Sequence, residues 1–336
     1  MKVSKLIVCL FGVLSVLASC KKSEANPQPP VKDPENKFRI VGYLFNSGGL
    51  SQESASVDFS KITHLNIAFI NPDANGNLTV SADLDQVIAR AHVSNVKVLF
   101  SFGGGDPPAH LKDLVKEDKR AAFIEKLVDL AVKHNFDGID VDLEGDFIDS
   151  NYEAFILALD ARVKANNKLL TAAVASWNHY NISDKALARF DFINVMSYDK
   201  TGPWNKANPG QHAPYSMAVD DIQLWNVTRK VPAEKISLGL PFYGYCFGTD
   251  LPDYMTYKDI VSTYPGSENA DQVDVPAKGT VYYNGIPTIK SKVTLAFEKQ
   301  LGGVMIWQLL QDANDSKSLL KAINEVVDLH NNLSNK

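Results

Sequence analysis

FDGIDVDLEGD, residues Phe136 to Asp146, alternates apolar residues with glycine and acids, which is the pattern of a β-strand. Three of its acids, Asp140, Asp142 and Glu144, are spaced two residues apart. Successive side chains of a strand point to opposite faces, so these three carboxyl groups share one face. Neighbouring like charges repel one another, so three aligned carboxyl groups are unfavourable. Their alignment therefore indicates a functional site.

Seven further apolar runs have the length and the Val, Ile and Phe content of buried parallel strands. They are Phe38–Phe45, Ile62–Ile70, Val96–Phe102, Leu169–Ala175, Phe190–Ser197, Ile236–Phe242 and Gly303–Leu309. Amphipathic stretches lie between them, such as AAFIEKLVDLAVKHN, where Phe123, Leu127, Leu130 and Ala131 recur at helical spacing. Eight strands with intervening helices over roughly 300 residues predict a single-domain (β/α)8 TIM barrel. A doubly wound open sheet is the alternative, but no G-x-G-x-x-G turn follows the first strand.

The first twenty residues, MKVSKLIVCLFGVLSVLASC, predict a targeting segment, with two lysines before an apolar run that is too short to span a membrane. Leu17-Ala18-Ser19-Cys20 resembles the lipobox of bacterial lipoproteins, which implies cleavage before Cys20 and lipid attachment to its sulfur. Ordinary secretion is the alternative. We therefore expect a signal peptide over 1–19, a flexible tether over 20–37 and a catalytic domain over 38–332, exported and anchored to a membrane by lipid.

The composition of the chain indicates which classes of partner the protein can bind. The chain has 336 residues, is 45% hydrophobic and 22% charged, and carries a formal charge of −5, so it is globular and has no basic cluster for nucleic acid. Cys246 is the one cysteine of the expected domain, and we interpret it as a structural thiol. The seven histidines show no paired-ligand spacing, so we expect no bound metal ion. We also expect no cofactor, and we expect the protein to be a monomer.

Barrel enzymes carry their chemistry at the C-terminal ends of the strands. Those ends hold Asp142 and Glu144 on the fourth strand. Asp140 and Asp142 are too close for both to ionise freely, so we expect them to share a proton. Glu144, at the mouth and crowded by negative charge, should have a raised pKa and could act as a general acid. A structural ladder of acids or a divalent metal site are the alternatives, but the strand shows no cationic partners, and metal ligands usually come from several loops.

Several segments together resemble glycoside hydrolase family 18, the chitinase family. Asp137–Glu144 is similar to its D-G-x-D-x-D-x-E signature. Other similar motifs, in the expected order, are Val41-Gly42-Tyr43, Ser101-Phe102-Gly103-Gly104, Met196-Ser197-Tyr198-Asp199, Leu238–Gly244 and Gly302–Trp307. The resemblance covers about residues 38–330 and implies that chitin or N-acetylglucosamine oligosaccharides are the substrate.

The resemblance also implies a retaining reaction in which the substrate's 2-acetamido group replaces a protein nucleophile. Glu144 would protonate the glycosidic oxygen, Asp142 would hold the acetamido N–H, and Asp140 would supply or store a proton for Asp142. Tyr198 would donate its hydroxyl to the acetamido oxygen. The expected substrate-binding residues are Tyr43, Phe69, Gly103, Gly104, Met196, Asp199, Trp204 and Trp307.

Other readings remain open for this family. Its members include endo-β-N-acetylglucosaminidases that cut N-glycans and lectins that have lost catalysis, and a surface protein that binds chitin oligosaccharides is a further alternative. The short stretch Tyr245–Pro287 predicts at most a small insertion after strand seven, with a hairpin in TVYYNGIP at an Asn-Gly turn, and hence an open groove. We expect Asp137 to brace the turn or a neighbouring strand, Trp225 to be core, and Trp177 to be a weaker candidate for sugar contact.

Overall fold

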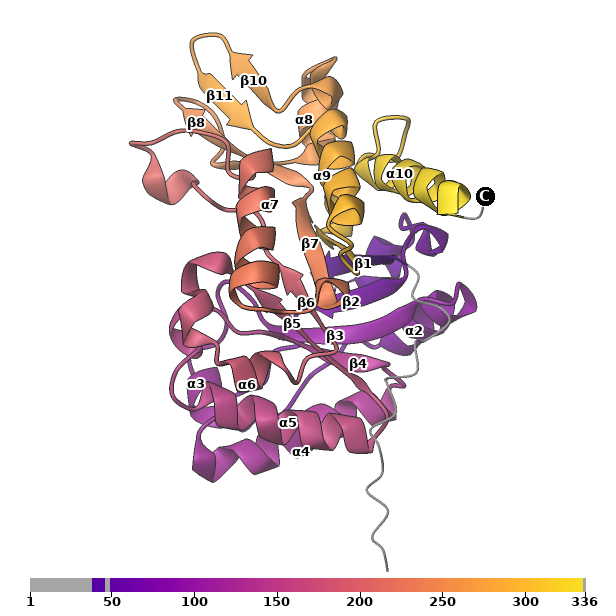
Figure 1. Cartoon of the computed structure of the whole chain (residues 1–336), viewed down its shortest axis with the longest axis vertical. Helices are drawn as coiled ribbons and strands as arrows, with labels where there is room; N and C mark the ends of the chain where they lie inside the picture. Colours follow the sequence, from indigo (N-terminus) through magenta and orange to yellow (C-terminus); the bar gives the residue numbers. More distant parts are fainter. Residues whose placement is uncertain (1–37, 46–48, 335–336) are drawn as a thin grey trace, which may run out of the picture. The chain divides into compact units, whose positions relative to one another are not determined.

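Eight parallel strands close into a barrel in the computed structural model, which describes residues 38–45 and 49–334. The strands are β1 (Arg39–Phe45), β2 (His64–Ala68), β3 (Lys97–Gly103), β4 (Gly138–Asp142), β5 (Leu169–Val174), β6 (Phe192–Val195), β7 (Ile236–Pro241) and β12 (Gly303–Trp307). Their order around the barrel is β1-β12-β7-β6-β5-β4-β3-β2 (Figure 1). Each strand lies within one predicted run, except that β3 extends one residue beyond its run to Gly103, so the predicted TIM barrel is confirmed. The predicted signal peptide, Cys20 and the tether lie outside the described residues.

Helices surround the barrel. They are α1 (Leu50–Ser54), α2 (Leu84–Val93), α3 (Leu111–Leu114), α4 (Glu117–Lys133), α5 (Tyr152–Ala165), α6 (Asp184–Leu187), α7 (Tyr215–Ile222), α8 (Tyr257–Thr263), α9 (Ile286–Glu298) and α10 (Leu319–Ser334). On α4 the four residues predicted from their spacing, Phe123, Leu127, Leu130 and Ala131, are all buried. None of the helices in the described part of the chain has the length and apolar content needed to cross a bilayer.

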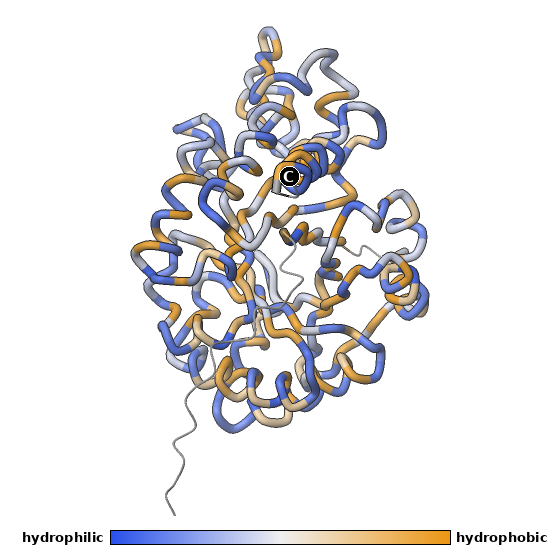
Figure 2. Tube along the Cα trace, turned by 45° about the vertical axis from the view of Figure 1, so that its right-hand side comes forward, coloured by the Kyte–Doolittle hydropathy of each residue, from blue (hydrophilic) through white to orange (hydrophobic). Residues whose placement is uncertain are grey.

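Two apolar layers follow from the alternation of side chains along the strands. On β1, Ile40 and Leu44 point outward into the large core between strands and helices, whereas Val41 and Tyr43 point into the barrel. The same alternation sends Ile139 and Val141 of β4 into the outer core. Figure 2 shows hydrophilic and hydrophobic residues alternating along the helices that surround the barrel.

The register of the barrel decides which residues meet Asp140. On β3 Ser101 lies beside Asp140, and on β5 Thr171 lies beside it on the other flank. Gly103 lies beside Asp142. Asp137, one residue before β4, accepts from the backbone N–H of Val98 on β3 at 2.7 Å, so the prediction that it braces a neighbouring strand is confirmed.

An insertion follows β7, as predicted, but it contains more structure than one hairpin. β8 (Tyr243–Gly248), β9 (Tyr254–Thr256), β10 (Gln272–Val275) and β11 (Gly279–Tyr282) form a four-stranded antiparallel sheet, with α8 beside it (Figure 1). The predicted hairpin turn at Asn284-Gly285 is wrong. Gly285 is the N-cap of α9, while the hairpin turn lies between β10 and β11, where the left-handed Ala277 and Gly279 reverse the chain.

Candidate active site

The two aspartates of β4 are buried inside the barrel, and Glu144 lies two residues farther along, at the mouth. Asp140 has no solvent exposure and Asp142 has 4%. Glu144 is the N-cap of the short helix η2 (Gly145–Phe147), two residues after the end of β4. The predicted alignment of the three carboxyl groups is therefore present in the fold.

Asp140 is held by neutral donors from four other strands. The hydroxyl of Tyr43 donates to its Oδ2 at 2.7 Å, and the hydroxyl of Ser101 donates to the same oxygen at 2.8 Å. Thr171 donates to Oδ1, and Asn194 Nδ2 reaches Oδ1 at 3.3 Å. Burial raises the pKa of Asp140, while these donors oppose the rise because they stabilise the carboxylate.

Asp142 has the opposite surroundings. Its Oδ1 is buried and has no hydrogen-bond partner within the described part of the chain. Burial raises its pKa well above the ordinary value, and the charges of Glu144 and Asp140 raise it further. A protonated Asp142 at rest fits the expected sharing of a proton along the strand, which stays a prediction.

The pKa of the Glu144 carboxyl group is raised from its ordinary value into the neutral range. Burial raises its pKa to about 7, and the charge of Asp199 adds to the rise. Asp199 has a left-handed backbone (φ 63°), a conformation that is uncommon for a residue other than glycine. Its Oδ1 accepts from the hydroxyl of Tyr243, and Nδ1 of the buried His212 lies 3.5 Å away.

A small cavity of about 190 Å³ lies against these groups. Trp307 lines it, and its ring lies 5.6 Å from the ring of Phe69 and 5.6 Å from that of Tyr43. Met196 and Tyr198 follow β6 and line the cavity together, as their shared parity predicts. The Tyr198 hydroxyl has Sδ of Met305 as its hydrogen-bond acceptor at 3.7 Å, and burial raises the pKa of this phenol.

Gly103 and Gly104 leave room for this wall of the site. Both have positive φ, 106° and 91°. A Cβ on Gly103 would lie 2.1 Å from the backbone oxygen of Asp142, and one on Gly104 would lie 2.6 Å from the ring of Phe69. Only a residue without a side chain fits at these two positions, so both glycines make room for the neighbouring backbone and for the ring of Phe69.

A wider cleft of about 880 Å³ continues outward from Glu144. Trp204 and Trp177 line it with exposed rings, 64% and 65%. Trp177 was the weaker candidate from sequence, yet it lies on η3 (Ser176–Asn181) as openly as Trp204 lies on η4 (Pro203–Asn205). Trp225 is fully buried, as predicted.

Sequence reasoning missed the residues around Asp199. Tyr243 and Tyr245 of β8 contact the buried His212, with ring centroids 4.9 and 5.0 Å away. Asp221 of α7 lines the cleft and keeps an unpartnered Oδ2. The alternation in the segment FYGY could have pointed to the two tyrosines, but nothing local marks His212 or Asp221.

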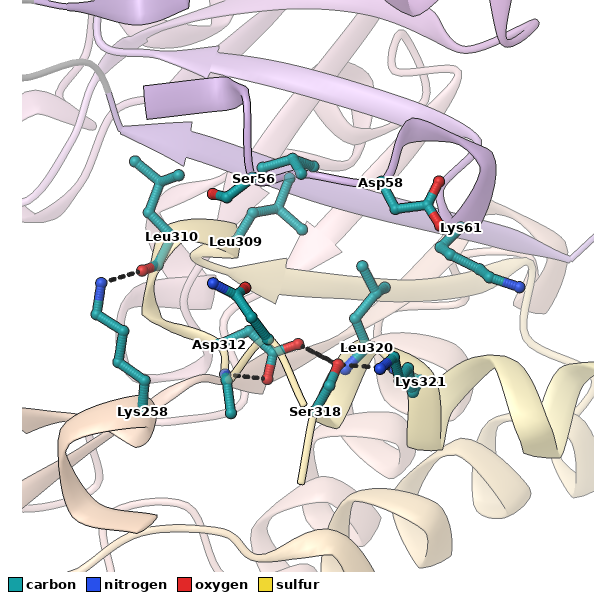
Figure 3. A pocket seen from close by; sticks show the side chains of 13 residues that line it. Ser56, Asp58, Lys61, Lys258, Leu309, Leu310, Asp312, Ser318, Leu320 and Lys321 are labelled. Atoms are coloured by element: carbon teal, nitrogen blue, oxygen red, sulfur yellow. Dashed lines mark hydrogen bonds between the residues drawn. The ribbon is translucent and has the colours of Figure 1, made fainter. Parts of the chain in front are cut away.

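Another cavity, of about 400 Å³, lies between the segment that follows α1 and the start of α10 (Figure 3). Two of the charged groups that line it, Asp312 and Lys258, are engaged in hydrogen bonds to the backbone. Asp312 accepts from the backbone N–H groups of Leu319 and Leu320. Lys258 Nζ donates to the carbonyl of Leu310 (Figure 3). Within 38–45 and 49–334, no three His, Cys, Asp or Glu side chains form a group that could hold a metal ion.

A TIM barrel with an acid at the end of β4, a second carboxyl group beside it and a tryptophan-lined pocket defines a glycosidase-type site. The match to the family model for glycosyl hydrolases family 18 covers residues 39–312, and the chain belongs to this family. The fold is similar to that of the GH18 chitinase ChiB from the chitin utilization locus of Flavobacterium johnsoniae, with 38% identity, a TM-score of 0.79, and coverage of 87% of this chain and 95% of that one.

Two further relatives show the range of the family. A chitinase from Bacteroides thetaiotaomicron is 28% identical with a TM-score of 0.74, over 87% of this chain and 96% of that chain. A chitinase-like effector from Moniliophthora roreri is 30% identical over 64% of this chain. The match spans 61% of the effector's length.

Proposed function

We propose that this protein is a chitinase that cleaves β-1,4 bonds between N-acetylglucosamine units, with the acetamido group of the substrate as the nucleophile. The observation that carries the proposal is the pairing of an acid, Glu144, with a buried and unpartnered Asp142 at one cavity lined by Trp307. The chitinase names of the relatives support this substrate class.

Glu144 is the general acid in this proposal. A pKa of about 7 leaves a large share of the carboxyl groups protonated at neutral pH, so the side chain can give its proton to the glycosidic oxygen as the bond breaks. Its position between the small cavity and the wide cleft suits a bond whose sugars occupy both spaces, because Glu144 lines both. Trp177 and Trp204 would stack on the sugars of the leaving side.

Asp142 is the partner of the acetamido group. Asp142 would pass its proton to Asp140, and its Oδ1, which has no partner among the described residues, would then accept the N–H of that group. Its negative charge would balance the oxazolinium ion that forms when the acetamido carbonyl attacks C1 and the bond from C1 to the leaving oxygen, protonated by Glu144, breaks. Tyr198 would donate to the acetamido oxygen. Water, which gives a proton to the Glu144 carboxylate, then adds to C1 and opens the oxazolinium ion, and the two inversions at this carbon retain the anomeric configuration.

The proposal is tested by following the products formed from N-acetylglucosamine oligomers. Glu144→Gln should hydrolyse them at least ~100-fold more slowly than the wild type while still binding them, since only the transferable proton is lost. Asp146→Asn is the matched control, because Asp146 is two residues away and its side chain is 96% exposed. It should keep near-normal turnover.

Assays on other substrates in parallel distinguish the alternative functions. Release of glycans from a high-mannose glycoprotein, without cleavage of chitin oligomers, would assign the chain to the endo-β-N-acetylglucosaminidases. Binding of oligomers with no turnover by the wild type would make it a chitin-binding protein. Cleavage of cello-oligomers at comparable rates would overturn the acetamido mechanism, because cello-oligomers carry no carbonyl oxygen beside C1.

We also propose that the protein is exported and attached to a membrane through lipid on Cys20. The sequence Leu17-Ala18-Ser19-Cys20 supports this proposal.

A further inference from the structure

A lysine that the proposed reaction does not use lies buried behind the cleft. Lys292 is on α9 and has no solvent exposure. Its Nζ donates to the carbonyl oxygen of Ala213 and to Oδ1 of Asn284, each at 2.8 Å. Asn284 Nδ2 donates to the same Ala213 carbonyl at 3.0 Å. One backbone carbonyl therefore receives two side-chain donors inside the protein.

Burying this amine is unfavourable. Burial lowers the pKa of Lys292 to about 7, and the charges of Asp271 and Asp221 only partly offset that effect. An apolar side chain of similar length would fill the same space without the desolvation penalty. The side chain of Lys292 therefore contributes its donors, and Ala213 is where they are directed.

The Ala213 carbonyl belongs to a segment that leads back to Asp199. The preceding residue, His212, is fully buried, and its carbonyl accepts from the backbone N–H of Lys200 at 2.9 Å. Nδ1 of His212 lies 3.5 Å from Oδ1 of Asp199. Holding Ala213 therefore fixes the imidazole that packs beside the Asp199 carboxylate.

Asp199 in turn affects the pKa of Glu144. Its charge raises the pKa of Glu144, second only to burial. Its left-handed backbone is a conformation that surrounding contacts must maintain. Movement of Asp199 away from Glu144 would therefore lower the pKa of the acid and reduce the share of protonated enzyme at neutral pH.

We propose that Lys292 is a positioning residue, which holds the Ala213 carbonyl and so keeps His212 and Asp199 in place beside Glu144. The inference rests on the proposed function, in which Glu144 is the acid. The titratable groups along this path and around it include Asp271, Asp221, His212, Asp199, Tyr243, Tyr245, Tyr198, Asp142 and Glu144.

Lys292→Met tests the inference, because methionine has a similar length and no donor. We expect kcat/KM on an N-acetylglucosamine oligomer to fall about tenfold, the scale of one lost hydrogen bond to a positioned group. The alkaline limb of the kcat/KM profile should also move to lower pH. Lys290→Met is the matched control, since Lys290 is on the same helix, where it is partly exposed and pairs with Glu325 at 2.6 Å. It should change neither quantity.

The direction of the shift separates positioning from simple electrostatics. Loss of a positive charge alone would raise the pKa of nearby carboxyl groups and move the alkaline limb to higher pH. In the background Asp199→Asn, Lys292→Met should produce no further shift, because the charge through which it acts is already gone. A shift to higher pH, or additive shifts in the double variant, would overturn the inference.

Folding and activity are controlled separately. If Lys292→Met does not fold, Asn284→Ala removes the other donor to the same carbonyl and should move the limb in the same direction by a smaller amount. If the wild type does not cleave the oligomers, the proposed function fails. The inference is then decided by NMR titration of the Glu144 carboxyl carbon, whose pKa should be lower in Lys292→Met than in Lys290→Met. Equal values would contradict it.

Discussion

Asp140 and Asp142 are buried to nearly the same extent, yet their partners differ. Asp140 has donors from β1, β3, β5 and β6, which fix its carboxyl group in one orientation. Asp142 has an oxygen without any partner in the described chain, so its side chain loses little by turning toward a ligand. The fixed group suits a proton store and the unpartnered group suits a ligand contact.

The pKa of Glu144 gives a prediction for pH dependence. Its pKa is raised from 4.5 to about 7, so the acid is protonated below that pH and loses its proton above it. We expect kcat/KM on a soluble N-acetylglucosamine oligomer to fall as pH rises through about 7. Initial rates between about pH 5 and pH 9 test this. A profile that stays flat to the alkaline end would contradict the assignment of Glu144.

The sequence predicts these carboxyl groups because parity within one strand is a local property. It does not predict the donors to Asp140. Tyr43, Ser101, Thr171 and Asn194 lie on four different strands, and only the register of the closed barrel brings them to one carboxyl group. For the same reason His212 and Lys292, which lie outside the recognised motifs, were missed.

At the scale of elements, the contact between β3 and β4 depends on a residue without a side chain. Gly103→Ala should lower the free energy of unfolding by about 2 kcal/mol, since the new Cβ meets the backbone oxygen of Asp142 and the φ of 106° disfavours alanine. Urea denaturation measures this difference.

Gly210→Ala is the control for that experiment. A Cβ at Gly210 would have no heavy atom within 4 Å, so stability should change by no more than about 0.5 kcal/mol. Equal midpoints for the two variants would show that the wall beside Asp142 tolerates displacement.

Element prediction succeeded where a pattern was long and failed where one dipeptide carried it. The helix α4 has a full apolar face, and its buried residues were predicted. Asn284-Gly285 favoured a turn by its residue types alone. In the fold Asn284 is buried and donates to Ala213, and the chain passes directly into α9. Tertiary contacts override a local turn preference here.

At the scale of the whole molecule, the order of the motifs predicts the barrel, because each strand end must supply its group to one rim. The insertion after β7 was predicted to be small but not as a sheet. Its strands are short, and β9 has only three residues, too few for a periodic signal.

The proposed anchor gives a prediction for the intact protein. Cys20→Ala, expressed with its own leader in a bacterium that processes lipoproteins, should move from the membrane fraction to the soluble fraction. Its activity per molecule on N-acetylglucosamine oligomers should not change. A wild type that is already soluble after export would refute lipid attachment.

The unpartnered, buried Asp142 has a consequence for the stability of the whole fold. The pKa values of Asp140, Asp142 and Glu144 are raised in the folded protein, so the folded state binds more protons than the unfolded chain above about pH 4. Stability contributed by these groups is complete at lower pH and is lost as pH rises through their folded pKa values. Each group can contribute up to about 1.4 kcal/mol per pH unit.

The melting temperature of the ligand-free protein should therefore depend on the protonation of these three carboxyl groups. We expect the melting temperature of the wild type to fall more steeply between about pH 4 and pH 8 than that of Asp142→Asn, in which one proton-binding group is removed. Differential scanning calorimetry of the two proteins measures the difference, and parallel curves would contradict it. Protons taken up on folding would then report the protonation state of the Asp140, Asp142 and Glu144 carboxyl groups without any substrate.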